Sequence, residues 1–328
     1  MWILAALAVA VLAVLIYLAC LDGTIHLRRS LEVEAPVEQV FATVLDLKSW
    51  PQWSPWLLHE ADAELTFSNN CQAEGGYCSW AGKVVGAGKL THLEIRPNRS
   101  IRQQIESLKP FKSVTRVDWE FEKLGDKTRL SCELSGRMPF LFRFMVKTME
   151  PMAERDCELG LALLGGYLNR AMAYPVIAIF SPEELAGFGY WAIPCNGNLR
   201  QLEAARRSSI ETLRSNAAAR IGLSLTLYHQ FDPYAAQFQA ENAVPVNDNP
   251  PPSNYQRRRF EGGQFIKMTL QGDLRFLPLG WHALASHCRM HRFKIDPKRP
   301  ALEIYADDPG ATIDGNQTTT TLYLPIKT

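Results

Sequence analysis

The residue best placed for chemistry in this chain is Glu303, in the segment ALEIYADDP at 301–309. Glu303 alternates with the apolar residues Leu302 and Ile304, a pattern that predicts a β-strand. The carboxylate then faces either solvent or the interior. Pattern alone favours solvent, because isolated carboxylates are seldom buried without a partner. If it is buried among aromatic rings instead, it could act as an acid or a base.

Two sets of aromatic residues could line a binding site, although each member is more often an ordinary core residue. In the second half of the chain, candidates to accompany Glu303 are Tyr190, Trp191, Tyr228, Trp281 and Tyr305. In the first half, core packing and the lining of an apolar pocket are equally compatible with Trp53, Trp56, Trp80 and Trp119, with Trp50 and Tyr77 nearby. Polar points for such a pocket could come from Glu74, Arg102 and Glu106.

Motifs that would specify catalysis or metal binding are missing from the sequence. There is no HExxH, GxSxG, CxxC or GxxxxGK[ST] segment. His287 and His291 stand one helical turn apart, which is a weak zinc hint without a third ligand, and a basic face with Arg289 and Arg292 explains them as well. Arg206 is predicted to extend over a core edge rather than to bind an anion. We therefore expect no metal and no cofactor.

The overall charge gives no reason to expect nucleic acid as a partner. The formal net charge of the 328 residues is +1, and the longest basic run is Arg257 to Arg259, so no field would attract a polyanion. The seven cysteines form an odd, scattered set. Scattered cysteines usually serve as small buried apolar residues, and their odd number mildly favours a reducing compartment.

The first 21 residues carry no charge and consist almost entirely of Ala, Val, Leu and Ile. As a helix they would span roughly 30 Å, the thickness of a bilayer core. A cleaved signal peptide is the alternative, but the run is long for one and no basic residue precedes it. We expect an uncleaved, single-pass anchor over residues 1–23. Arg28 and Arg29 follow it closely and favour a cytoplasmic soluble part.

The next 150 residues predict a curved sheet covered by a long helix. Residues 31–56 predict a strand, a short amphipathic helix after Pro36 and an aromatic turn. Short alternating runs between 65 and 134 predict an antiparallel meander. Residues 140–170 predict helix, with Pro151 near the start of a long amphipathic segment. Strand, short helix, sheet and long helix together make a helix-grip arrangement.

Two motifs carry a family resemblance in this region: APVEQVFATVLDLKSWPQWSPW at 35–56 and YCSWAGKVVGAGKLTHLEI at 77–95. They resemble the SRPBCC superfamily of START-like ligand-binding domains, in particular its polyketide-cyclase-like, membrane-anchored bacterial branch. The resemblance implies a deep, largely apolar cavity and a bacterial inner membrane, but no fixed chemistry. We place this domain at 24–172.

The remaining residues, 173–328, predict a second domain made of two βαββ halves, a pseudo-repeat. The predicted helices are 199–220 and 277–293, and the predicted strands are 189–194, 224–231, 237–246, 257–270, 301–307 and 318–326.

The segments ENAVPV at 241–246, EGGQFIKMTLQGDL at 261–274 and LEIYADDP at 302–309 resemble GyrI-like effector-binding domains, which also occur in AraC-type regulators. The resemblance implies that Glu303 lies in the binding cleft, where it attracts a cationic ligand or polarises a substrate. No helix-turn-helix segment precedes this domain, so a role in transcription is not implied.

The sequence thus predicts an α+β protein with an N-terminal transmembrane helix, a helix-grip domain and a GyrI-like domain. The expected function is binding of hydrophobic or amphipathic, and in part cationic, small molecules at the membrane. A hydrolase or cyclase that uses Glu303 as acid or base is the alternative. A scaffold with filled pockets is the third hypothesis.

Overall fold

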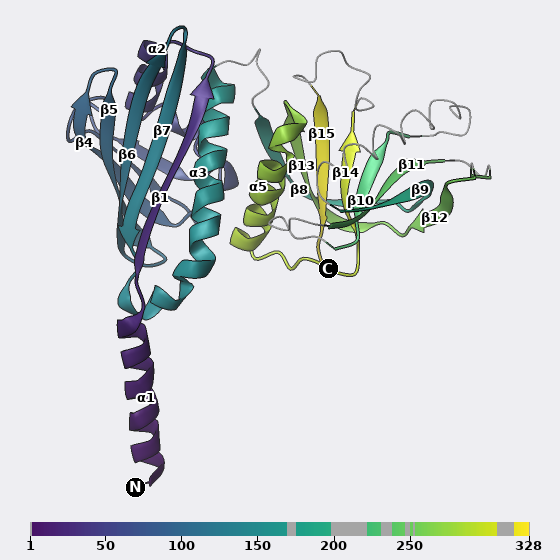
Figure 1. Cartoon of the computed structure of the whole chain (residues 1–328), viewed down its shortest axis with the longest axis horizontal. Coiled ribbons are helices and arrows are strands. Elements are labelled where there is room, and N and C mark those ends of the chain that lie inside the picture. The colour runs from purple at the N-terminus through teal and green to yellow at the C-terminus, as the bar shows by residue number, and fades with distance from the viewer. Residues whose placement is uncertain are drawn as a thin grey trace. The chain divides into compact units, whose positions relative to one another are not determined.

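The computed structural model describes residues 2–168, 175–197, 222–230, 238–246, 250–251, 253–306 and 318–327. The chain forms two compact units, Met1–Leu164 (unit 1) and Gly165–Thr328 (unit 2). Each unit is built on one antiparallel sheet with helices, so the predicted α+β class is confirmed. Figure 1 shows both units as ribbons.

The N-terminal helix α1, Trp2–Cys20, is long and apolar enough to cross a membrane by length and composition. Its side chains are almost all exposed, and Leu18 in the last turn is the buried exception among them. A helix with this composition at the N-terminus is also typical of a signal sequence. Only three residues separate α1 from the first strand of unit 1.

The unit 1 sheet has the strand order β1-β7-β6-β5-β4-β3-β2, and its strands agree closely with the predicted meander. They are β1 (Thr24–Val33), β2 (Glu64–Phe67), β3 (Tyr77–Ala81), β4 (Ala87–Arg96), β5 (Ser100–Lys109), β6 (Ser113–Leu124) and β7 (Lys127–Arg137). Each pairs with its sequence neighbour, except that β1 closes on β7.

The short helix α2, Val37–Leu45, is the predicted amphipathic helix after Pro36, and it buries Val37, Val40, Phe41 and Val44. Two 3-10 helices follow: η1 (Trp50–Gln52) and η2 (Leu57–His59).

The long helix of unit 1 begins earlier than the sequence predicts. After the 3-10 helix η3, Phe140–Met145, the helix α3 runs continuously over Val146–Leu168. Pro151 was expected near its start but lies in the second turn. There it removes one backbone hydrogen bond without ending the helix.

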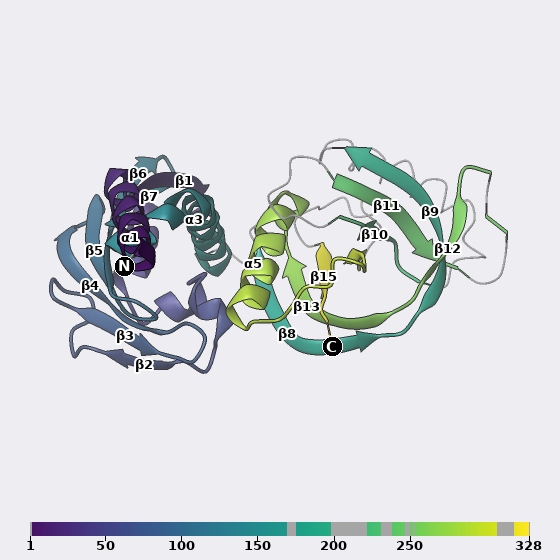
Figure 2. The same ribbon diagram turned by 90° about the horizontal axis from the view of Figure 1, so that it is seen from below.

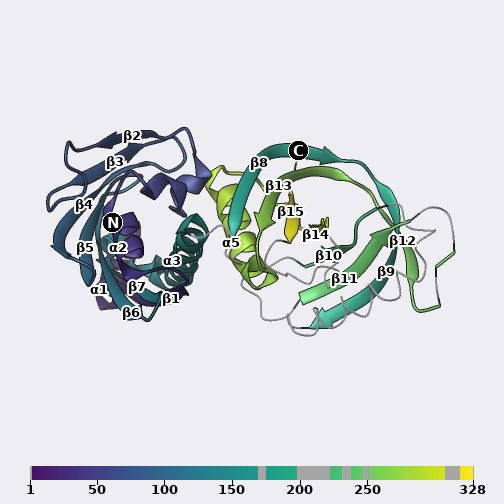
Figure 3. The same ribbon diagram turned by 90° about the horizontal axis from the view of Figure 1, so that it is seen from above.

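The unit 2 sheet has the order β12-β9-β11-β10-β14-β15-β13-β8 and is strongly curved, as Figures 2 and 3 show from its two ends. Its strands are β8 (Val176–Leu185), β9 (Phe188–Gly197), β10 (Leu225–Tyr228), β11 (Phe238–Pro245), β12 (Gln256–Phe260), β13 (Gly263–Gln271), β14 (Ala301–Tyr305) and β15 (Thr319–Pro325). The 3-10 helix η5 (Leu274–Phe276) leads into the helix α5 (Leu277–Met290), which packs on β13 and β15.

The prediction of one strand over 257–270 is wrong, because this segment forms two strands, β12 and β13, on different neighbours. The chain turns between them at Gly262, whose φ is 73°, and a Cβ there would collide with the backbone carbonyl of Leu185. Only glycine fits such a turn. Glycine inside an alternating pattern therefore marked a turn rather than a strand residue.

The two-half repeat of unit 2 stays a prediction. The strand order β9-β11-β10 next to β14-β15-β13 is symmetric about the β10–β14 pair. The helix predicted at 199–220, together with Arg206, lies outside the described residues.

Candidate functional site

Glu303 lies on β14 with only 1% of its surface exposed, so the orientation toward solvent that pattern alone favoured is wrong. Its Oε1 accepts hydrogen bonds from the Tyr228 hydroxyl at 2.8 Å and from Trp281 Nε1 at 2.7 Å. Its Oε2 accepts one from the Tyr305 hydroxyl at 2.6 Å. Three of the five aromatic candidates of the second half therefore surround this carboxylate.

The register of the sheet explains why these residues meet. Thr226 on β10 pairs directly with Glu303, and with Asn242 of β11 on its other side, so all three share one face. Tyr228 and Tyr305 each lie two residues along their strands and project to that same face. Helix α5 packs against the sheet and supplies Trp281. Strand alternation sets which residues share a face, and α5 covers the face that carries Glu303.

A chain of polar side chains leads away from Glu303 along the same face. The Tyr305 and Thr226 hydroxyls lie 2.8 Å apart, and Thr226 Oγ1 lies 3.2 Å from Asn242 Oδ1. The Asn242 Nδ2 is buried without a hydrogen-bond partner. Turning the amide over would let Nδ2 donate to Thr226, which could then donate to Tyr305 and Tyr305 to Glu303. That orientation places one proton in each of the three contacts, whereas with Oδ1 toward Thr226 the contact between Thr226 and Tyr305 has no proton to share.

The opposite face of the sheet holds a second buried carboxylate, Glu241 on β11, which pairs with Leu227. Its Oε1 lies 3.0 Å from Arg258 Nε and its Oε2 lies 3.2 Å from His229 Nε2. Burial raises the pKa of the Glu241 carboxyl, but the hydrogen bond and charge of His229 and the charge of Arg258 outweigh burial and lower it overall. Glu241 is therefore held as an anion.

Tyr190 lies beside Glu241, on the other face from Glu303. Its hydroxyl donates to Glu241 Oε2 at 3.3 Å. Burial and the Glu241 charge raise the pKa of Tyr190 to about 12, so the phenol stays neutral. A pocket of about 420 Å³ opens next to it, lined by His229, Arg258, Arg259, Lys298 and Arg299, among others.

Trp191, the remaining aromatic candidate of the second half, belongs to a separate buried cluster with Val244, Val246 and Tyr255. Its strand, β9, lies three strands from β14, a separation of about 14 Å at the usual strand spacing. Neither Trp191 nor its sequence neighbour Tyr190 therefore lies beside Glu303.

The tryptophans of unit 1 pack on one another between the helices and the sheet. Trp53, Trp80 and Trp119 are buried. Trp53 meets Trp119 edge to face at 6.1 Å between ring centres, and Trp80 lies 5.7 Å from Trp50. Trp56 is 39% exposed and donates its Nε1 hydrogen to the Val85 carbonyl at 3.0 Å. We call the four residues of these two ring pairs, Trp50, Trp53, Trp80 and Trp119, the aromatic layer. Its role in ligand binding stays a prediction.

A buried polar pair beneath this layer was missed by the sequence analysis. Trp119 Nε1 donates to Gln103 Oε1 at 2.8 Å, and Gln103 Nε2 lies 3.2 Å from His92 Nδ1. Burial lowers the pKa of His92, so the ring is neutral. Its Nε2 can then donate to the Leu45 carbonyl, 3.0 Å away. The strict alternation of Leu90 and His92 on β4 was the signal that could have found it.

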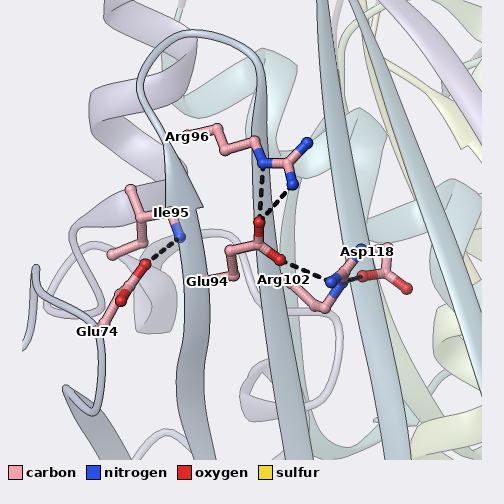
Figure 4. Close-up of polar contacts among 6 residues, drawn as sticks. All are labelled: Glu74, Glu94, Ile95, Arg96, Arg102 and Asp118. Atoms are coloured by element: carbon pink, nitrogen blue, oxygen red, sulfur yellow. Dashed lines mark hydrogen bonds and ion pairs between the residues drawn. The ribbon is translucent and has the colours of Figure 1, made fainter.

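The charged residues considered for a cavity in unit 1, Glu74, Arg102 and Glu106, are exposed or partly exposed. Figure 4 shows the contacts of Glu74 and Arg102. Arg102 pairs with Glu94 at 2.6 Å and with Asp118 at 2.9 Å on an exposed face of the sheet. Glu74 accepts a hydrogen bond from the Ile95 backbone at 3.0 Å. Glu106 lies 3.9 Å from Lys89, with both side chains partly exposed. None of these three residues projects into the aromatic layer.

The rings of His287 and His291 lie 4.0 Å apart between their centres and are tilted by 31°. Burial and the neighbouring His291 lower the pKa of His287 to about 4. Within the described residues, no group of three or more His, Cys, Asp or Glu side chains could hold a metal ion.

Comparison with known proteins supports the first domain. Residues 24–168 match the family described as polyketide cyclase/dehydrase and lipid transport, which confirms the SRPBCC-like prediction for that segment. No curated protein gives a significant match to the chain.

Similar solved structures include the Zhui aromatase/cyclase from Streptomyces sp. R1128, with 16% identity, 45% of this chain and 94% of that chain covered and a TM-score of 0.36. Protein MLL2253 from Mesorhizobium loti is 15% identical, and the match covers 44% of this chain and 98% of that protein with a TM-score of 0.35. The EcmrR C-terminal domain is 14% identical, and the match covers 47% of this chain and 98% of that domain with a TM-score of 0.40.

Proposed function

Starting from a polyketide-cyclase-like domain at residues 24–168, we propose that this protein binds hydrophobic or amphipathic small molecules, including cationic ones, at a membrane. In this proposal α1 is a single-pass anchor in a bacterial inner membrane, with the soluble part in the cytoplasm. The helix-grip domain, 24–172, binds the apolar compounds among these ligands. A GyrI-like domain, 173–328, takes cationic compounds.

The observation that carries the proposal is the setting of Glu303. A carboxylate surrounded by Tyr228, Trp281 and Tyr305 combines a negative charge with aromatic rings in a region of low water content. Rings attract cations through their π faces, and the attraction grows when both partners are desolvated. An aromatic cation gains from both effects, whereas a neutral compound of the same shape gains from apolar burial alone.

The test is a binding measurement on the full chain in lipid nanodiscs, with tetraphenylphosphonium as the cationic probe and triphenylphosphine oxide as the uncharged one. The Glu303→Gln variant keeps the side-chain shape and removes the charge. We expect it to weaken tetraphenylphosphonium binding about tenfold, equivalent to about 1.4 kcal/mol. Binding of the uncharged probe should stay within twofold of the unaltered protein.

The matched control is Glu241→Gln, which removes the other buried carboxylate of unit 2 and lies on the opposite face of the sheet. We expect it to leave the affinity for tetraphenylphosphonium unchanged. Equal binding of that cation by the unaltered protein and both variants would refute the role assigned to Glu303. Empty nanodiscs correct for partition of the probes into lipid.

One observation favours an enzyme as the second candidate. The 2.6 Å bond between Tyr305 and Glu303 and the 2.8 Å contact onward to Thr226 form a path along which a proton can move. Glu303 would accept a proton from water while the water oxygen adds to an electrophilic carbon of the substrate. Hydrolysis of p-nitrophenyl butyrate that disappears in Glu303→Gln, with the uncharged probe still bound, would favour this candidate.

A further inference from the structure

We propose that the end of the unit 1 sheet next to α1 is a docking surface for a bilayer containing anionic phospholipid. The helix-grip domain then lies directly on the membrane instead of being tethered at a distance from it. This inference rests on the proposed membrane anchor and adds which surface of the domain contacts lipid. Four features of unit 1 support it.

The first feature is the short connection between α1 and the sheet. The helix ends at Cys20 and β1 begins at Thr24, so three residues, which span at most about 11 Å, join them. Thr24 pairs with Arg137 at the end of β7. If α1 crosses the bilayer, this end of the sheet must start at its surface. Figure 1 shows α1 extending away from this end of the unit 1 sheet.

The second feature is a packed junction. Arg143 on η3 places Nη1 3.5 Å from the carbonyl oxygens of Leu18 and Leu21. These are carbonyls at the helix C-terminus, where a positive charge is favourable. The Met138 backbone N–H donates to the Gly23 carbonyl at 2.8 Å. A Cβ at Gly23 would lie 2.9 Å from the Arg143 side chain, so the close approach depends on glycine. The domain is therefore held against α1.

The third feature is a belt of exposed apolar side chains around the junction. On η3, Leu141 and Phe144 are 61% and 58% exposed. Leu108 and Val114, which flank the β5–β6 turn, are 53% and 54% exposed. The stacked rings of Phe111 and Phe142, 5.4 Å apart, join this turn to η3. We define the apolar belt as Leu108, Val114, Leu141 and Phe144. An exposed apolar patch of this kind is typical of a surface that contacts a membrane or a partner rather than water.

The fourth feature is the charge that flanks the belt. Lys109 ends β5, Lys112 lies in the β5–β6 turn, Arg137 ends β7 and Lys147 lies in the first turn of α3, and all four side chains are exposed. Apolar side chains flanked by basic ones are typical of segments that insert at the interface of an anionic membrane. The acidic residues Asp22 and Glu150 line a pocket at the junction together with Arg143 and Lys147, where two acidic and two basic side chains balance. The surplus positive charge beside the belt therefore comes from Lys109, Lys112 and Arg137.

The experiment is spin-label depth measurement on the full chain in vesicles of phosphatidylcholine and phosphatidylglycerol. Of the seven cysteines, Cys20 is exposed and the other six are buried, so Cys20→Ser gives a background with few reactive thiols. Labels are attached at Leu141→Cys and Val114→Cys in the belt, at Leu12→Cys in α1, and at Asp126→Cys in the β6–β7 turn at the opposite end of the sheet.

Collision with oxygen reports lipid, and collision with a water-soluble nickel chelate reports solvent. We expect the labels at 12, 114 and 141 to favour oxygen and the label at 126 to favour nickel. Docking would be overturned, and the anchor would stand, if the label at 12 lies in lipid while the labels at 114 and 141 collide with nickel as often as the label at 126 does. Exclusion of both reagents from 114 and 141 would indicate a protein partner and also overturn the proposal. Nickel access at 12 would overturn the anchor and, with it, docking.

Discussion

Glu303 and Glu241 are buried carboxylates on opposite faces of one sheet, and their surroundings differ in kind. The described partners of Glu303 are the neutral donors Tyr228, Trp281 and Tyr305. Glu241 instead faces the guanidinium of Arg258 and the ring of His229. A cation beside a carboxylate cancels its charge, whereas hydrogen bonds from neutral donors stabilise the charge without cancelling it.

The comparison also separates stability from recognition. The Glu241 group joins β11 to β12 through β9, because Arg258, Tyr190 and Glu241 come from these three strands. It holds the edge of the sheet together. The Glu303 group joins β10 and β14 to α5, so a ligand that displaced one aromatic donor would meet the carboxylate directly. We expect substitutions to have different consequences at the two sites.

The largest expected effect is that of Glu303→Ala. It leaves three buried donors without their acceptor, each of which costs about 1–3 kcal/mol when unsatisfied. Water that enters the vacated space offsets part of this cost, so we expect Glu303→Ala to lower the free energy of local opening of β14 and α5 by about 3 kcal/mol. Glu303→Gln should lower the same free energy by about 1 kcal/mol. Hydrogen exchange of peptides from these elements, followed by mass spectrometry, measures both. Equal effects of Ala and Gln would show that the donors find other partners.

An intermediate effect is expected for Glu241→Gln. It removes the ion pair with the half-exposed Arg258 and should weaken the protection of β11 and β12 by about 1–2 kcal/mol. Because the folded pKa of Glu241 is lowered below its ordinary value of 4.5, its contribution is complete above about pH 4.5 and is lost as the pH falls through the folded pKa.

The acid dependence separates this pair from general acid effects. The protection factor of β11, which is the exchange rate corrected for the pH dependence of intrinsic amide exchange, should fall below about pH 4.5 in the unaltered protein. In Glu241→Gln that added loss of protection should be missing. The same acid loss in both proteins would assign it to other groups.

The sequence predicted the strands of unit 1 well because its turns are marked by Asn, Gly and Pro and its strands pair with sequence neighbours. Of the five aromatic residues named as candidates beside Glu303, Tyr228, Trp281 and Tyr305 contact it, whereas Tyr190 and Trp191 lie elsewhere in the sheet. The expectation that Glu303 faces inward depended on a family resemblance, because alternation alone assigns no face. The split between β12 and β13 was missed because one Gly-Gly step looked like part of a strand.

Glu241 and His92 were missed for a different reason. Each has partners from strands that are distant in sequence: Arg258 for Glu241, and Gln103 together with the carbonyl of Leu45 for His92. Sequence spacing reveals partners within one helix or strand, but not those brought together by strand order. Buried polar residues in an alternating strand are therefore a warning that a partner exists, without naming it.

The smallest expected effect lies in unit 1, where Arg102 bridges Glu94 and Asp118 on the exposed sheet face (Figure 4). Hydrogen bonding to Asp118 raises the pKa of Arg102, but water screens such pairs and ordering the long side chains offsets their attraction. We expect Arg102→Ala to leave exchange of β5 within the error of repeated measurements. A loss as large as that of Glu241→Gln would mean that exposed carboxylates hold this protein together as firmly as buried ones, and the contrast between the settings of its carboxylates would fail.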